Sequence, residues 1–316
     1  MKLKNVKTYK NDRYDDSSTG KSEEPGQCAR FLTIPRDFRE EVERAKRKKE
    51  PGDLELLADE ARGFEWETEG LRLVGRAQFE LKALEGARVT WEAIRSENDQ
   101  DVEANTKLGA IRQRPGDLTG SDQALKRVLL FTGHRIDAPG RAEPRFPPDK
   151  IDVAKQKIAE AVTAEQKIAG GIAYGISGGA SGGDILFHQV CEEMNIPTRM
   201  FLAVPRKLYI SSSVADAGPQ WIEEFNRLMK SRQRRVLCDS MELPRWLQDK
   251  PDYNIWQRNN LWNLHNALAA AGGENVTLIA LWNGKSGDGP GGTADMVQKA
   301  RERGAKIIIL DTNKIL

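Results

Sequence analysis

Two glycine-rich segments, well separated along the chain, are the part of this sequence best suited to chemistry. Residues 177–184 read SGGASGGD and follow the apolar run 171–176, while residues 287–295 read GDGPGGTAD and follow the apolar run 276–282. Glycine allows tight turns and lets a ligand approach the backbone N–H groups closely. A helix that begins at such a turn points its unpaired N–H groups and the positive end of its dipole at the same place. The two turns therefore predict a cradle for a phosphate-bearing ligand.

A third candidate segment follows the apolar run that starts at residue 127. Thr132 offers a hydroxyl, Gly133 allows close backbone approach, and Arg135 carries a planar cationic fork suited to phosphate or carboxylate. Two alternatives stay open, because Arg135 could instead pair with Asp137 or Asp184. The complete set of predicted ligand-binding residues is Thr132, Gly133, Arg135, Ser177, Gly178, Gly179, Ser181, Gly182, Gly183, Asp184, Gly291, Gly292 and Thr293.

Several of these residue types also have ordinary structural explanations. A histidine beside a glycine, as at His134, is more typical of a structural role than a catalytic one. Asp184 could simply cap the helix that follows it. The segment 205–214, which contains Arg206 and Lys207, could meet an anionic ligand or form a basic surface loop. Tyr253 could stack on a base or belong to the core.

Asp288 and Asp295 are the acidic residues of the second glycine-rich turn and are the candidate catalytic residues. Either could act as a general base or hold ribose hydroxyls. Asp295 also falls in a first helical turn, where interaction with the helix dipole is a sufficient reason for an acid. No cofactor and no metal ion is expected.

The elements that must position these residues alternate between strand and helix. Near-continuous apolar strands between amphipathic helices indicate an α/β fold, a Rossmann-like doubly wound parallel sheet. Such a sheet binds ligands at the carboxyl ends of its strands. The predicted strands are 127–131, 171–176, 198–203, 276–282 and 306–310, and the predicted helices are 149–169, 184–194, 220–231, 253–271 and 292–304.

The first part of the chain is different in character. Residues 1–36 are polar and predict a disordered arm, and residues 36–49 predict a charged helix with a solvated face. Between residues 53 and 112, apolar residues at three- and four-residue steps predict four more helices. A breaker cluster at 115–121 marks the boundary, which gives three parts: 1–36, an N-terminal α-helical region at 37–120, and 121–316.

The four helices resemble the tetratricopeptide (TPR) repeat, whose period is ~34 residues. An ordinary helical hairpin packed on the core is the alternative. The TPR resemblance covers residues 54–114 and rests on Leu81, Ala83, Leu84, Ala87, Trp91, Ile94, Asp101, Val102, Glu103, Ala104, Leu108 and Gly109.

Composition excludes several classes of protein. The chain has 316 residues, 39% of them hydrophobic, and a formal net charge of +2, which is typical of a soluble globular protein and makes nucleic acid an unlikely partner. Cys28, Cys191 and Cys238 lack metal-ligand spacing. No apolar run approaches the ~18 residues of a membrane span and the N-terminus has no signal peptide, so a cytoplasmic location is expected.

Three strand-end motifs in order make residues 126–316 similar to the SLOG superfamily of Rossmann-like domains. The motifs are 132–135 (TGHR), 177–184 (SGGASGGD) and 289–293 (GPGGT). This superfamily includes phosphoribohydrolases that activate cytokinins and ligand-sensing domains of bacterial signalling and defence systems. The resemblance implies that these loops bind phosphate and ribose.

The chain departs from the hydrolase branch of that superfamily. There, a Pro-Gly-Gly-x-Gly-Thr turn leads to a glutamate three residues after the threonine, whereas the turn here ends at Thr293 without the x-Gly step and Met296 stands in the glutamate's place. The resemblance therefore favours a cytoplasmic sensor of a nucleotide-derived small molecule, with the helical region binding a protein partner or a second copy. The alternative is an enzyme that hydrolyses the N-glycosidic bond of a nucleotide or NAD. A nucleic-acid-binding role has only the basic residues of segments 44–49 and 232–235 in its favour.

Overall fold

The computed structural model describes residues 33–113, 126–138, 140–168, 170–285 and 291–315. Its centre is a six-stranded sheet in which all neighbouring strands are parallel, in the order β4-β3-β2-β1-β5-β6. The predicted α/β class is confirmed. The strands are β1 (Arg127–Gly133), β2 (Ile172–Ser177), β3 (Thr198–Leu202), β4 (Gln233–Val236), β5 (Val276–Trp282) and β6 (Lys306–Asp311).

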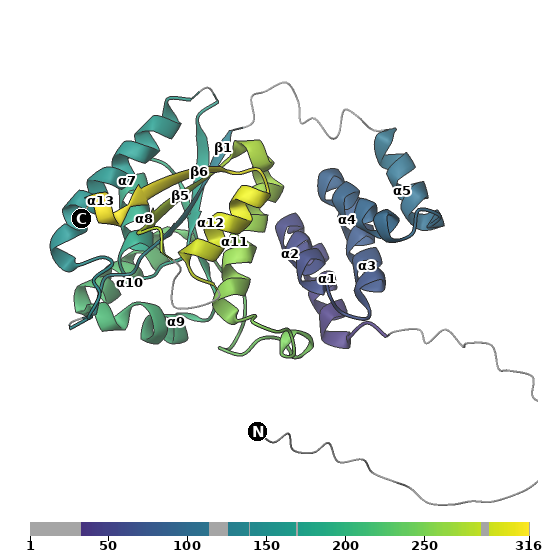
Figure 1. Ribbon diagram of the computed structural model, residues 1–316, viewed down its shortest axis with the longest axis horizontal. Helices are drawn as coiled ribbons and strands as arrows, with labels where there is room; N and C mark the ends of the chain where they lie inside the picture. The colour runs from purple at the N-terminus through teal and green to yellow at the C-terminus, as the bar shows by residue number, and fades with distance from the viewer. Residues whose placement is uncertain (1–32, 114–125, 139, 169, 286–290, 316) are drawn as a thin grey trace, which may run out of the picture. The chain divides into compact units, whose positions relative to one another are not determined.

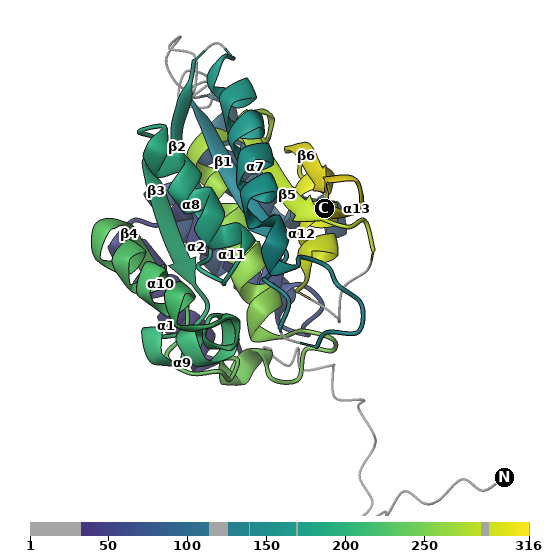
Figure 2. The same cartoon turned by 90° about the vertical axis from the view of Figure 1, so that its left-hand side faces the viewer.

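Helices cover both faces of this sheet, as Figure 1 shows, with α7 and α8 on one side and α11 and α12 on the other. Successive side chains of a strand point to opposite faces of the sheet. Leu129 and Phe131 of β1 therefore pack with α7 and α8, while Leu130 packs with α11 and α12. The helices of this part are α7 (Ile151–Gln166), α8 (Gly183–Glu193), α9 (Arg206–Ser213), α10 (Pro219–Ser231), α11 (Ile255–Ala271), α12 (Thr293–Glu302) and α13 (Thr312–Ile315), with short 3-10 turns η1 (Pro148–Lys150), η2 (Ala215–Ala217), η3 (Arg245–Leu247) and η4 (Gly273–Asn275). Figure 2 shows α7 and α8 running in front of the strands.

Two elements differ from the sequence prediction. Residues 206–213, expected either to meet an anionic ligand or to form a basic surface loop, form α9, which buries Tyr209 and Ser213 one turn apart. Strand β4 was not predicted, because its sequence QRRV holds a single apolar residue, Val236. It exists because its backbone pairs with β3 at the edge of the sheet.

Strand order reverses at the centre of the sheet, where β1 lies between β2 and β5. In doubly wound folds the loops at the carboxyl ends of the strands separate at this switch point and leave a crevice for a ligand. The three motifs picked out from the sequence follow β1, β2 and β5, so the topology brings them to the same crevice.

The N-terminal helical region consists of α1 (Arg36–Lys48), α2 (Pro51–Ala61), α3 (Glu67–Glu80), α4 (Leu84–Glu97) and α5 (Val102–Arg112). The four helices expected between 53 and 112 are present. The expected solvated helix at 36–49 is more deeply packed than predicted, since Phe38 and Val42 are completely buried. Residues 1–32 of the predicted arm and the whole boundary cluster at 115–121 lie outside the described residues.

Residues 33–316 form one compact unit, and α2 packs directly on α11. Two arginines of the α/β part, one buried and one half-buried, form ion pairs with the N-terminal helical region. The Arg258 Nε lies 2.9 Å from Glu60 Oε1, and the Arg235 Nη2 lies 2.6 Å from Asp53 Oδ2. Trp262 of α11 also donates its Nε1–H to Asp53 over 2.6 Å. Among the described residues, no helix is long and apolar enough to cross a membrane.

Candidate functional site

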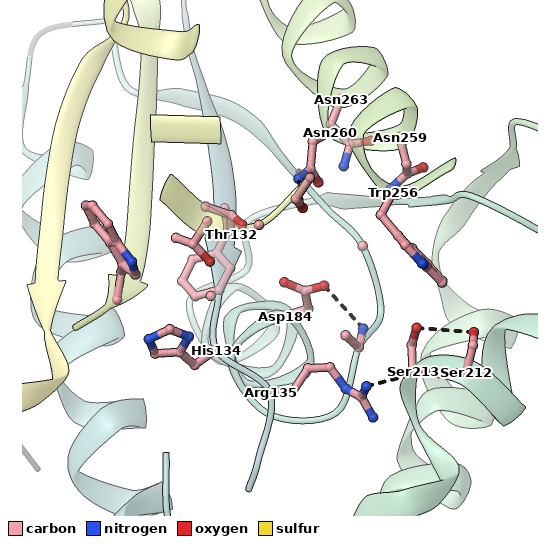
Figure 3. A pocket seen from close by; sticks show the side chains of 18 of the residues that line it. Thr132, His134, Arg135, Asp184, Ser212, Ser213, Trp256, Asn259, Asn260 and Asn263 are labelled. Carbon is pink, nitrogen blue, oxygen red and sulfur yellow. Dashed lines mark hydrogen bonds between the residues drawn. The ribbon is translucent and has the colours of Figure 1, made fainter. Parts of the chain in front are cut away.

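A cavity of about 380 Å³ lies at the carboxyl ends of the central strands, at the switch point between β1 and β5. Figure 3 shows Thr132, His134, Arg135 and Asp184 on one side of it and residues of α11 on the other. The cavity is lined by Phe131, Thr132, Gly133, His134, Arg135, Arg145, Gly178, Ala180, Asp184, Tyr209, Ser212, Ser213, Trp256, Asn259, Asn260, Asn263, Trp282, Gly291, Gly292 and Thr293.

The structure separates the predicted ligand-binding residues into two groups. Eight of them line the cavity: Thr132, Gly133, Arg135, Gly178, Asp184, Gly291, Gly292 and Thr293. The other five, which do not line it, are Ser177, Gly179, Ser181, Gly182 and Gly183.

The turn after β2 uses most of its N–H groups within the protein. Gly179 N–H donates to the Tyr209 hydroxyl (3.0 Å), Ser181 N–H to the Ser213 carbonyl (3.0 Å), and Gly183 N–H to the His134 carbonyl (3.1 Å). These groups are therefore not available to a phosphate, although the sequence predicts that role for them. The turn instead fixes the shape of the cavity wall.

Glycine is required at two positions of this turn. Gly182 has φ = 101°, and a Cβ there would lie 2.7 Å from the backbone nitrogen of Ile136. A Cβ on Gly178 would lie 2.6 Å from Asp184 Oδ2 and 2.8 Å from the Tyr209 hydroxyl oxygen. The second clash is at the cavity wall, so a side chain at Gly178 would change the site itself.

Asp184 is the one carboxylate among the described residues that line the cavity. It lies in the first turn of α8, and its Oδ2 accepts the Ala180 N–H over 3.2 Å. Burial raises the pKa of Asp184 to about 6, because the charged form loses its hydration. Asp184 thus occupies the helix N-terminus at which the sequence predicts the phosphate of a ligand. Its carboxyl group can change protonation near neutral pH.

Arg135 and Arg145 bring positive charge to the cavity wall. Arg135 pairs with Asp216 and donates from Nη1 to the Ser212 carbonyl (3.2 Å), so the partners considered from the sequence, Asp137 and Asp184, are wrong. The Nε of Arg135 is buried and has no hydrogen-bond partner among the described residues. Asp137 instead accepts the N–H of Arg145 over 2.7 Å, which positions that residue.

His134 is neutral at physiological pH. Burial, followed by the positive charge of Arg145, lowers its pKa to about 4. Its Nε2 accepts the N–H of Asn283 over 3.2 Å, which ties the β1 loop to the loop after β5. This contact supports the structural interpretation of His134.

The turn after β5 differs from the turn after β2. Gly291, Gly292 and Thr293 line the cavity at the start of α12, and Gly291 is held by a 2.6 Å hydrogen bond from Asn260 Nδ2 to its carbonyl. Within the described part of the chain, the N–H groups of Thr293 and Ala294 have no protein acceptor. This helix terminus is therefore the better place for an anion.

The two candidate catalytic residues are not brought into the cavity by the described structure. Asp295 does not line it; one of its oxygens lies 3.8 Å from Lys299 Nζ, and burial raises the pKa of its carboxyl group. Asp288 lies outside the described residues. Arg206 and Lys207 also do not line the cavity, and Tyr253 donates its hydroxyl to Glu60 (2.7 Å) at the contact with the helical region.

Residues of α11 and α9 were missed as site residues. Tyr209, Ser212 and Ser213 come from α9, and the sequence prediction of a loop hid them. On α11 the sequence WQRNNLWN carries the signal, because Trp256, Asn259, Asn260 and Asn263 recur at helical spacing. A run of amides at that spacing is visible in the sequence, but only the fold shows that it faces the sheet ends.

Among the described residues, no cluster of His, Cys, Asp or Glu side chains is arranged to hold a metal ion. Cys191 is buried and Cys238 is half-buried, and neither forms a disulfide. In comparisons with known proteins, no protein-family model matches the chain. No curated protein matches it either.

Proposed function

We propose that this protein is a ligand sensor of the SLOG type, whose α/β part binds a small molecule derived from a nucleotide. One observation carries the proposal: a cavity at the switch point of a parallel sheet combines two arginines with the N-terminus of α12. Arg135 and Arg145 supply charge suited to phosphate, and the α12 terminus supplies N–H groups. If these groups formed only a structural network, the buried Nε of Arg135 would have no hydrogen-bond partner among the residues that the structure describes.

Other polar groups that line the cavity suit the rest of such a ligand. Thr132, Ser212 and Thr293 offer hydroxyl groups, and Asp184 offers a carboxyl group, which are the usual partners of ribose hydroxyls. Because α11 contributes to the cavity and also packs on α2, ligand binding could alter the helical region. That region would then bind a protein partner or a second copy.

The first test is a thermal-shift and calorimetry screen against AMP, ATP, NAD, ADP-ribose and cyclic nucleotides. A ligand at about a hundred times its Kd should stabilise the fold by ~2.7 kcal/mol. Arg135→Met should weaken binding at least tenfold, whereas Arg206→Met, which removes an arginine outside the cavity, should not. If no phosphate-bearing compound shifts the melting temperature, the proposed function is wrong.

A second candidate function, hydrolysis of an N-glycosidic bond, is favoured by the position of Asp184. Its carboxylate could take a proton from water as the water oxygen bonds to the anomeric carbon and the bond to the base nitrogen breaks, with the base leaving with the electron pair. Product analysis of each binding mixture tests this. Turnover that Asp184→Asn abolishes, with binding retained, would establish the enzyme; a bound ligand that stays intact would exclude it.

A further inference from the structure

One face of α11 forms the wall of the cavity opposite the arginines. Trp256, Asn259, Asn260 and Asn263 stand at positions i, i+3, i+4 and i+7, which share one side of a helix, and all four line the cavity. Figure 3 shows them along α11, across from His134 and Arg135. The wall therefore carries an aromatic ring and three carboxamides but no formal charge.

The three asparagines do not have the same surroundings. Asn260 has a structural partner, because its Nδ2 donates to the Gly291 carbonyl. Asn259 and Asn263 are only 5% and 4% exposed, yet the Oδ1 atom of each has no hydrogen-bond donor among the described residues. Buried polar atoms in proteins are nearly always paired, so two unpaired carboxamide oxygens one helical turn apart need an explanation.

A ligand in the cavity supplies that explanation. The torsion of an asparagine carboxamide about Cβ–Cγ is broad and roughly two-fold, so rotation can present either its oxygen or its NH₂ group to the cavity. A carboxamide pairs best with an edge that carries a donor beside an acceptor. Adenine has this arrangement, with an exocyclic amino group beside a ring nitrogen, and asparagine reads adenine through it.

We infer that the α11 face, defined by Trp256, Asn259 and Asn263, selects a ligand whose base is an amino-bearing purine of the adenine type. The inference rests on the proposed function and adds the identity of the base. The amino group donates to a carboxamide oxygen, and the base stacks on Trp256, which is half-buried and packs edge-to-face with the ring of Tyr209 (centroids 6.1 Å apart). The phosphate then lies across the cavity from α11, toward Arg135 and Arg145.

Two nucleotides that differ only in the amino group test this assignment. AMP carries it, and purine riboside 5′-monophosphate lacks it; ribose 5-phosphate lacks the base and reports the phosphate side alone. Calorimetry should show AMP binding at least about tenfold tighter than the purine analogue, because the analogue leaves the carboxamides unpaired. In the double variant Asn259→Leu/Asn263→Leu the two nucleotides should bind within about twofold of each other, with binding of ribose 5-phosphate retained.

One control variant and three contrary results show whether the inference about the base fails alone or together with the proposed function. Asn226→Leu removes an asparagine that contacts Arg206 outside the cavity, and it should leave the preference for AMP unchanged. Equal binding of AMP and the analogue to the natural protein, or an unchanged preference in the double variant, overturns the inference while the proposed function stands. If none of these three compounds and no other phosphate-bearing compound of the screen binds, both fail. If the double variant does not fold, the comparison of the two nucleotides on the natural protein decides.

Discussion

At the scale of single residues, Gly178 tests whether the cavity has the shape described. A methyl group at this position would press on Asp184 and the Tyr209 hydroxyl, at 2.6 and 2.8 Å. We expect Gly178→Ala to weaken ligand binding at least tenfold, as measured by calorimetry. Gly109→Ala is the matched control, because a Cβ there meets nothing within 4 Å; a helical glycine replaced by alanine should gain up to about 1 kcal/mol of stability. Normal binding by Gly178→Ala would show that the ligand lies elsewhere.

His188 should make stability depend on pH. Its Nδ1 contacts the Thr198 hydroxyl (2.8 Å) and its Nε2 the Gly178 carbonyl (3.0 Å), and burial lowers its pKa to about 4. The unfolded chain takes up the proton near pH 6.5, so this contribution to stability is complete above pH 6.5 and falls by about 3 kcal/mol as the pH drops to 4. Urea unfolding at pH 7.5, 6 and 5 measures the slope.

The variant His188→Asn isolates that contribution. It should be less stable than the natural protein at pH 7.5, and the difference should shrink as the pH falls. Asp184 acts in the opposite direction, because its raised pKa favours the folded state at low pH, but it is present in both proteins and its effect cancels. A difference in stability that does not change with pH would mean that His188 is not held neutral.

At the scale of elements, the sequence predicts those strands and turns that are determined by the types of their own residues. The strands at β1 and β5 were recognised because each is an apolar run buried on both faces. Strand β4 was not, because its pairing with β3 and the ion pairs of Arg235 with Glu50 and Asp53 stabilise it. Neither contact is visible in a four-residue segment with three polar residues. The glycine turns were recognised from residue type alone. The amides of α11 were not, because only packing places a polar helix face against the sheet ends.

The contact between α2 and α11 depends on a buried ion pair. Arg258 and Glu60 have side chains only 1% exposed and lie 2.9 Å apart, with Glu41 also on the guanidinium. Glu60→Gln removes the main partner of a buried charge and should lower the free energy of unfolding by about 3–5 kcal/mol. Chemical denaturation measures it. Glu40→Gln breaks an exposed pair with Arg36 and should change stability by less than about 0.5 kcal/mol, so similar losses in the two variants would refute the importance of burial.

At the scale of the whole molecule, α11 serves both parts of the chain. Asn259 and Asn263 on one side line the cavity, while Arg258, Trp262 and His265 contact acidic residues of α2. His265 strengthens this contact. Burial alone would lower its pKa, but the hydrogen bond with Asp59 and the Glu55 carboxylate, 3.5 Å from Nδ1, raise it above the usual value and favour the charged form. A ligand that orders α11 therefore acts on a helix that the N-terminal region also holds.

Hydrogen exchange can show whether this connection transmits binding. With AMP or another compound that stabilises the protein, amide exchange should slow in α11 and also in α2. The ion pairs between the two helices couple their opening, so a ligand that holds α11 in place should also make α2 open less often. Helix α5, which packs on α4, is the internal reference and should change less. In Glu60→Gln the slowing should be lost from α2 but kept at the cavity. If the natural protein shows slowing only in the cavity loops, the helical region does not respond to the ligand, and the site would act alone.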